Sequence, residues 1–356
     1  MSPSPAKARV GHFFEDFRLG QRLVHAVPRT VTEGDAALYV AFTGSRFPVP
    51  CATTAARALG YRAAPVDDLL AFHVVFGRTV ADVSLNALAN LGYAQGRWLA
   101  PVFPGDTLAT ESEVIGLREA SNGQAGVVWV RSVGRNQTGA VVLDYVRWVL
   151  VAKRDALSPA PVATVPELAA RVGPETLVLP DGLDGFAYDT AVSGSNALWE
   201  DYAPGERIDH VDGVTIEEAE HMMATRLYQN PAKVHFDQHR QGTSKLGRRL
   251  IYGGHVISLA RALSFNGLAN AFRLAAINGG RHVAPCVAGD TVYAWSEVLE
   301  SAALSGRADL GALRVRTVAT KNHPCADFPL KGADGKDHPA VLLDLDTWVL
   351  LPRRRG

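Results

Sequence analysis

The feature that most constrains the fold of this chain is an internal repeat. The stretch LDYVRWVL at residues 143–150 returns as LDLDTWVL at residues 343–350, 200 residues further along. Earlier pairs keep the same order, among them GQRLVH with GERIDH and PVFPGDTLATESEV with PCVAGDTVYAWSEV, at offsets of 185 and 184 residues. Self-similarity kept in constant order over this length indicates a tandem duplication of a whole folding unit.

The duplication also predicts the domain organisation. A chain of 356 residues has the length expected of about two domains. Residues 156–205 contain the Pro- and Gly-rich segments SPAPVATVP and LPDGLDG, which are typical of a connector lying over the surface. We therefore place the boundary near residue 165, with an N-terminal unit at 1–164 and a connector followed by the C-terminal unit at 165–356.

Each copy shows the same predicted order of elements. A helix comes early: Thr32 precedes EGDAALYVAFTG in the first copy, and Thr215 can cap IEEAEHMMATRLY in the second. The apolar face of the second helix is predicted to contain Ile216, Ala219, Met223 and Leu227. The period then changes to two in VVWVRSVGRN, VVLDYVRWVLV, LRVRTVATKN and VLLDLDTWVLL, which predicts strands. A helix followed by an antiparallel sheet long enough to wrap it predicts an α+β double hot-dog fold.

Composition excludes several classes of protein. Thirty-six Lys and Arg balance thirty-six Asp and Glu, so no basic field would attract nucleic acid. The three cysteines (Cys51, Cys286 and Cys325) are too widely spaced for a disulfide framework or a structural zinc site, and they suit a reducing compartment. Neither a signal-peptide core nor an uncharged apolar run of membrane-spanning length is visible. We expect a cytoplasmic protein with no nucleic-acid or membrane partner.

Differences between the copies indicate where chemistry resides. After the early helix the first copy reads FTGSRFPVPCA and the second reads LYQNPAKVHFDQH, and only the second contains histidine near the helix end. His235 follows the helix in a polar, Pro-interrupted segment, and a pKa of about 6.5 would let it exchange protons near neutral pH. A solvated loop histidine is the alternative interpretation. His25 and His210 occupy matched places in both copies, which favours a structural role.

These segments carry a resemblance to a known family. The order helix, LYQNPAKVHFD, IYGGHVISLA, PCVAGDTV resembles the MaoC-type (R)-specific enoyl-CoA hydratases, double hot-dog members included. Longer runs, such as ALYVAFTGSRFP and APVDDLLAFHVVFGRTVADVSLNALANLGYAQGRWLAPVFPGDT, resemble its mesaconyl-CoA hydratase (β-methylmalyl-CoA dehydratase) group over nearly the whole chain. The resemblance implies reversible hydration of an α,β-unsaturated acyl-CoA substrate, mesaconyl-C1-CoA. Because the sequence contains no metal-ligand cluster such as HxxxH with a further ligand, no GxGxxG after a strand and no GxxxxGK(S/T), we expect neither a metal nor a cofactor.

The resemblance also implies residue roles. Hydration needs a base for water, a proton donor for the α-carbon and hydrogen-bond donors for the thioester oxygen. His235 fits the acid–base role. Gly254, with its neighbour Gly253, fits the amide-donor role because glycine lets a ligand approach the backbone closely. A Gly-rich turn that starts a helix is a further interpretation, and a helix N-terminus would itself favour an oxyanion.

One departure from the family motif concerns the catalytic Asp expected five residues before the histidine. Counting back from His235 gives Asn230, whereas keeping the Asn-Pro pair in register gives Tyr228 and requires two inserted residues. We prefer Asn230 because it needs no insertion and also aligns Asp237 with the family's second Asp. An amide can orient water but cannot hold its proton, so Asp237 or Glu218 is expected to assist.

The first copy has Ser45 and Pro50 at the corresponding positions, so it is expected not to catalyse and to widen the acyl pocket instead. A mesaconyl group is branched and carries a carboxylate, for which arginine is the best geometric match. The candidate substrate-binding residues are Arg46, Arg226, Lys233, Tyr228 and His255.

Two other functions remain open at this stage. An acyl-CoA thioesterase of the same fold would attack the thioester carbonyl, and a non-catalytic acyl-CoA-binding protein would need no acid or base. Hot-dog units often pair through sheet edges, and the strand at 343–350 could extend such a sheet, or the two copies could satisfy each other within one chain. A homo-oligomer, most simply a dimer, is therefore expected.

Overall fold

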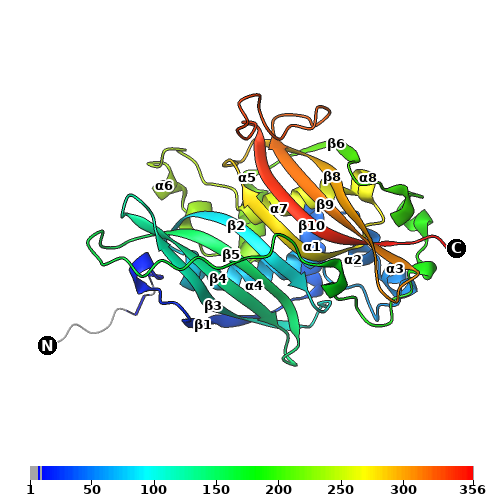
Figure 1. The fold of residues 1–356 in the computed structure, drawn as a ribbon, viewed down its shortest axis with the longest axis horizontal. Coiled ribbons are helices and arrows are strands. Elements are labelled where there is room, and N and C mark those ends of the chain that lie inside the picture. Colours follow the sequence, from blue (N-terminus) through cyan, green and yellow to red (C-terminus); the bar gives the residue numbers. More distant parts are fainter. Residues whose placement is uncertain (1–6, 9, 356) are drawn as a thin grey trace.

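The computed structural model describes residues 7–8 and 10–355. Ten strands within these residues form one antiparallel sheet in the order β1-β3-β4-β5-β2-β7-β10-β9-β8-β6 (Figure 1). The strands of the first half are β1 (Arg22–Thr30), β2 (Ala87–Trp98), β3 (Thr107–Glu119), β4 (Ala125–Arg135) and β5 (Val141–Ala152). Those of the second half are β6 (Arg207–Thr215), β7 (Arg273–His282), β8 (Thr291–Ala303), β9 (Leu310–Lys321) and β10 (Val341–Pro352).

The strand order is one pattern used twice. The half β1-β3-β4-β5-β2 corresponds strand by strand to β6-β8-β9-β10-β7, and the halves join where β2 pairs with β7, with Tyr93 opposite Gly280. The repeated octapeptides lie in the equivalent strands β5 and β10. The predicted fold class, two tandem helix-wrapped antiparallel units, is therefore confirmed. Of the two arrangements expected for sheet pairing, the one within a single chain is found, since β2 pairs with β7; β10 lies between β7 and β9 and does not extend the sheet, whose edges are β1 and β6.

The helices of the first half are α1 (Glu33–Thr43), α2 (Pro48–Cys51), α3 (Thr53–Ala58) and α4 (Asp68–Thr79), and those of the second are α5 (Glu218–Leu227), α6 (Gln238–Gln241), α7 (Gly253–Leu263) and α8 (Phe265–Leu268). The hydroxyl of Thr32 accepts from the Asp35 N–H at 3.1 Å, which confirms the predicted start of α1. Among the described residues, none of the helices has the length and apolar character that crossing a bilayer requires.

The second early helix differs from its prediction in two respects. Thr215 is the last residue of β6, and Glu217 occupies the N-cap of α5, so the predicted cap was two residues too early. Within the predicted apolar stripe, Ile216 and Leu227 are buried, whereas Ala219 and Met223 are exposed. The stripe was therefore right at its two ends and wrong in its middle, because sequence shows a periodic stripe but not the element that covers it.

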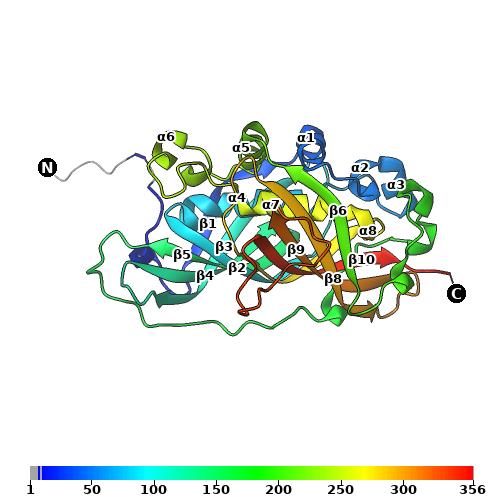
Figure 2. The ribbon, with the colours of Figure 1, turned by 90° about the horizontal axis from the view of Figure 1, so that it is seen from above.

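The helices wrapped by the sheet are α4 and α7 rather than the early helices α1 and α5, which corrects the predicted arrangement. All of α4 from Leu69 to Thr79 is buried, and α7 is buried continuously from Gly254 to Ala260. A helix that is apolar all round gives no amphipathic signal. Figure 2 shows α4 and α7 between the sheet and the outer layer formed by α1 and α5.

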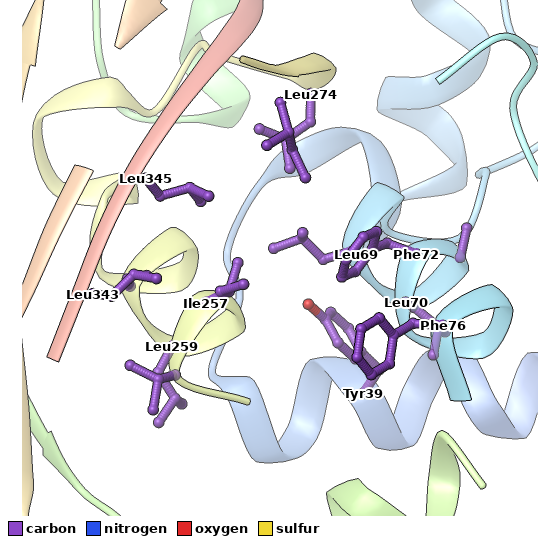
Figure 3. Close-up of a cluster of buried hydrophobic side chains, with 14 of the residues drawn as sticks. Tyr39, Leu69, Leu70, Phe72, Phe76, Ile257, Leu259, Leu274, Leu343 and Leu345 are labelled. Atoms are coloured by element: carbon purple, nitrogen blue, oxygen red, sulfur yellow. The ribbon is translucent and has the colours of Figure 1, made fainter. Parts of the chain in front are cut away.

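The main core fixes the two wrapped helices against the sheet. Figure 3 shows Phe72 of α4 and Ile257 of α7 pointing into one cluster with Tyr39 of α1 and Leu343 of β10. Burying one such side chain fully contributes about 1.5–3 kcal/mol. The cluster therefore holds the N-terminal end of α7 in a fixed position, which matters for the site below.

The connector runs along the side of the molecule opposite the outer helices (Figure 2). Thr164 forms a β-bridge with Leu117 of the first half, whereas the carbonyl of Val172 accepts from the Trp348 indole of the second half at 2.9 Å. The boundary near residue 165 lies between these contacts, and we keep it as a proposal.

The paired histidines have the structural role that their symmetry predicted. Nε2 of His25 lies 2.8 Å from the Ser112 hydroxyl, and Nε2 of His210 lies 2.8 Å from the Ser296 hydroxyl. Both rings are buried beside the first strand of their half. They link equivalent strand pairs and contribute to packing.

Candidate active site

A cavity of about 480 Å³ lies between the two halves, a size that suits a small-molecule ligand. The first half contributes residues of α4, β2 and β5, and the second contributes residues between 230 and 256, residues 282–286 and Leu342. Leu88 and Leu246 line it and are 65% and 46% exposed, so the cavity opens to solvent there. The corresponding space beside Pro50 of the first copy is only about 20 Å³.

His235 lines this cavity and is 7% exposed. Its Nδ1 lies 2.8 Å from the carbonyl oxygen of Leu250. Because a carbonyl only accepts, Nδ1 must carry the proton, and Nε2 is left with a free lone pair. Burial lowers the pKa of His235 to about 4, so the ring is neutral near pH 7. His235 is therefore a buried, neutral imidazole with a fixed tautomer rather than a solvated loop residue.

Asn230 lies beside it in the cavity wall and is 3% exposed. Its Oδ1 accepts the N–H of Ala232 at 3.0 Å, which orients the amide. No acceptor for Nδ2 is found among the described residues, so this nitrogen can donate to a bound molecule. The alternative alignment would require Tyr228 here, and Tyr228 does not line the cavity.

The N-terminus of α7 forms another part of the wall. The helix begins at Gly253 without a side-chain cap, which confirms that the Gly-Gly turn starts a helix. Gly253 lines the cavity, whereas Gly254 is buried behind it. A Cβ at Gly253 would lie 2.5 Å from the His282 ring. The first amides of a helix lack intrahelical acceptors and carry partial positive charge, so the backbone at Gly253 suits a developing oxyanion.

The charged candidates do not reach the cavity. Arg226 and Lys233 are exposed and do not line it. Arg46 forms a 3.8 Å ion pair with Asp212 and lies over the ring of Phe265. The prediction that one of these cations faces the acyl group is therefore not supported, because all three extend toward solvent or a surface partner.

The proposed assisting acids also have other contacts. Asp237 caps the short helix α6 by accepting from the Arg240 N–H at 3.0 Å. Glu218 is exposed and forms ion pairs with Arg248 and Arg249. Neither carboxylate lines the cavity, so the position of neither supports a role in proton transfer.

Tyr228 and His255 lie in the packed layer between the outer helices and α7. Tyr228 is fully buried, with its ring centroid 4.4 Å from that of His73. Nε2 of His255 lies 2.7 Å from the Glu220 carboxylate. Neither residue lines the cavity, so their positions indicate a packing role rather than contact with substrate.

Sequence reasoning missed several polar residues that line the cavity, among them His282 of β7 and Arg147 of β5. His282 lies with Nε2 3.1 Å from the Tyr93 hydroxyl, and burial lowers its pKa to about 4. Both residues differ between the copies: Trp98 stands in place of His282, and Thr347 in place of Arg147. Comparing the copies along the strands, and not only after the helix, would have identified them.

Comparisons with known proteins agree with this geometry. A family model described as mesaconyl-CoA hydratase matches residues 5–328. The chain is 61% identical over 349 residues to a β-methylmalyl-CoA dehydratase of Chloroflexus aurantiacus, covering 98% of this chain and 99% of that protein. It is 60% identical over 347 residues to a mesaconyl-CoA hydratase of Cereibacter sphaeroides, covering 98% and 100%.

Solved structures give the same result for the fold. A MaoC domain protein dehydratase from Chloroflexus aurantiacus superposes with a TM-score of 0.96 at 60% identity, covering 98% of this chain and 100% of that chain. A Mycobacterium tuberculosis protein described as a double hot-dog fold has a TM-score of 0.76 at 24% identity, covering 96% and 99%. The second likeness concerns the fold alone.

Proposed function

Because the chain belongs to the mesaconyl-CoA hydratase family, we propose that it catalyses the reversible addition of water to mesaconyl-C1-CoA, giving β-methylmalyl-CoA. The observation that carries this proposal is the arrangement around His235. A neutral imidazole with a free Nε2 and the uncapped N-terminus of α7 line one cavity, which is open to solvent at Leu88 and Leu246. A base for water and donors for a thioester oxygen are the two requirements of enoyl-thioester hydration.

The proton transfers can be assigned to a single imidazole. Nε2 of His235 takes a proton from water as the water oxygen bonds to the β-carbon, and the imidazolium then delivers that proton to the α-carbon. The enolate charge formed between these steps lies on the thioester oxygen, where the backbone N–H of Gly253 stabilises it. Positioned acid–base groups contribute about 10²–10⁴-fold in rate, and one oxyanion donor about 10²–10³-fold.

Asn230 has a supporting role in this scheme. Its Nδ2 donates to the water oxygen, while the bond from Ala232 to Oδ1 keeps the amide in place. Because His235 both takes and returns the proton, the reaction requires no carboxylate, which accounts for an amide where the family motif has Asp.

Spectrophotometry with the full chain tests the proposal. Mesaconyl-C1-CoA is added and the absorption of the conjugated enoyl thioester is followed together with free thiol. Loss of the absorption without thiol release is the expected result. Thiol release would instead indicate a thioesterase, and a bound spectrum without turnover would indicate an acyl-CoA-binding protein; either outcome contradicts the proposal.

We also infer a homodimer and a cytoplasmic location. Support for the dimer is that β1 and β6 end the sheet, each pairing on one side only within the described chain. Support for the location is that Cys51, Cys286 and Cys325 are free thiols, which suit a reducing compartment. Light scattering that gives the mass of one chain would refute the dimer.

A further inference from the structure

An incompletely bonded arginine lines the cavity. Arg147 of β5 is 0% exposed. Its Nη2 donates to the hydroxyl oxygens of Thr79 at 2.7 Å and Ser84 at 3.2 Å, and its guanidinium lies 4.3 Å from the centre of the Phe76 ring. Its Nε and Nη1 have no hydrogen-bond partner among the described residues. Two of its donor groups are therefore unused.

Arg147 also lacks a counter-ion. No carboxylate of the described residues forms an ion pair with it, whereas the buried Arg273 has Asp68 at 3.3 Å. A guanidinium stays protonated in proteins, and an unpaired buried charge costs several kcal/mol. Such a charge is retained most readily where a bound ligand supplies its partner.

The residues that line the cavity carry one net positive charge, which suits a ligand group with a single negative charge. None of these residues is acidic, and Arg147 is the one lysine or arginine among them. The imidazoles of His235 and His282 have pKa values lowered to about 4 by burial, so both are neutral near pH 7. Asn90 also lines the cavity, and its amide nitrogen and oxygen have no partner within the described chain.

Aromatic rings connect this polar region with the base. The Phe76 ring, on which Arg147 lies, has its centroid 5.6 Å from that of Tyr252. The Tyr252 ring is in turn 5.7 Å from the ring of His235. Arg147 and His235 are therefore contributed by different halves to one cavity, and the rings of Phe76 and Tyr252 lie in contact between them.

We propose, on the basis of the proposed function, that Arg147 binds the free carboxylate of the acyl group, with the Asn90 amide as a second donor. The substrate class is then short acyl-CoA thioesters that end in a carboxylate. In mesaconyl-C1-CoA this carboxylate is attached to the β-carbon, so holding it also positions the carbon that receives the hydroxyl. The catalytically silent first copy supplies specificity, and the second copy supplies the base.

Binding of unreactive analogues to the full chain tests this assignment. Succinyl-CoA carries the terminal carboxylate and butyryl-CoA lacks it, while both have four acyl carbons. Wild type is expected to prefer succinyl-CoA. In Arg147→Met that preference should fall roughly 10- to 100-fold, the range of a charge-assisted hydrogen bond, with butyryl-CoA affinity changed by less than about threefold.

Arg78 provides the matched control. It is a buried arginine of α4 that donates to the Val27 carbonyl at 3.0 Å and does not line the cavity. Arg78→Met should leave the preference for succinyl-CoA unchanged. If Arg147→Met keeps the preference, or weakens both ligands equally, the assignment is wrong. If Arg147→Met does not fold, Arg147→Lys decides: losing the planar fork should reduce the preference, and an unchanged preference overturns the proposal.

This experiment separates the two proposals. Binding needs no turnover. If the wild type does not hydrate mesaconyl-C1-CoA, but prefers succinyl-CoA and this preference is lost in Arg147→Met, only the proposed function is refuted. A wild type that hydrates the substrate, with Arg147→Met still selecting succinyl-CoA, would refute only the role of Arg147.

Discussion

Replacing Gly253 with alanine is expected to disable the site while the chain still folds. The new Cβ would lie 2.5 Å from Cε1, 2.7 Å from Nε2 and 2.8 Å from Nδ1 of His282. Because ordinary carbon contacts begin at about 3.5 Å, the ring must move by roughly 1 Å, which breaks its 3.1 Å hydrogen bond with Tyr93. The added methyl group also keeps a thioester oxygen away from the first amides of α7.

The expected magnitudes follow from these distances. Overpacking costs about 1–3 kcal/mol, partly offset by the gain of about 0.5–1 kcal/mol when alanine replaces glycine in a helix. The net loss of stability should be near 1 kcal/mol, and kcat should fall about 10²–10³-fold through loss of one oxyanion donor.

The assay is hydration followed by enoyl-thioester absorption at saturating substrate, with urea unfolding measured on the same preparation. Gly34→Ala is the control, because Gly34 lies on the exposed side of α1 and its Cβ would be 3.6 Å from the nearest atom, the Thr32 hydroxyl oxygen. That variant should keep full turnover. A Gly253→Ala protein with wild-type kcat would refute the placement of the thioester at α7.

Two further predictions concern protonation and the water-positioning amide. Burial lowers the pKa of His210 and His235 to about 4 in the fold, against about 6.5 unfolded. Between these two pKa values the unfolded state binds more protons than the folded state. The free energy of unfolding therefore has its full value above pH 6.5 and decreases as the pH falls toward 4. At pH 5 the loss should reach roughly 2 kcal/mol per histidine by urea unfolding, and equal stability at pH 7 and 5 would contradict this. Asn230→Ala should lower kcat about 10- to 100-fold with little change in KM. Asn230→Asp can still accept the Ala232 N–H but has no Nδ2 donor when ionised, so its kcat should fall by a similar factor; a wild-type kcat for Asn230→Asp in steady-state kinetics would rule out donation from Nδ2 to the water.

Much of the fold was predictable because duplication is visible without knowledge of packing. The octapeptides identified β5 and β10, the alternating runs identified β4 and β9, and Thr32 identified the start of α1. The wrapped helix α4 was not predicted, because its burial on all sides removes the amphipathic pattern that identifies a helix. Strands β1 and β6 were missed because their exposed edges carry mixed residues instead of clear alternation.

Short motifs predicted part of the cavity lining. His235, Asn230 and Gly253 line the cavity, whereas Gly254, the first choice for the amide donor, lies behind it; the catalytic roles stay predictions. Arg147 and His282 come from strands far away in sequence, and only the pairing of β2 with β7 and the joining of the halves bring them to the cavity. Their positions in regular strands suggested packing, so local sequence could not assign them to a site.

Whether the imidazole of the second copy performs the hydration can be measured as kcat of His235→Ala beside His239→Ala. His239 is an exposed histidine of α6, four residues away. We expect kcat to fall at least about 10²-fold in His235→Ala and to stay unchanged in His239→Ala. Wild-type turnover of mesaconyl-C1-CoA by folded His235→Ala would contradict this expectation.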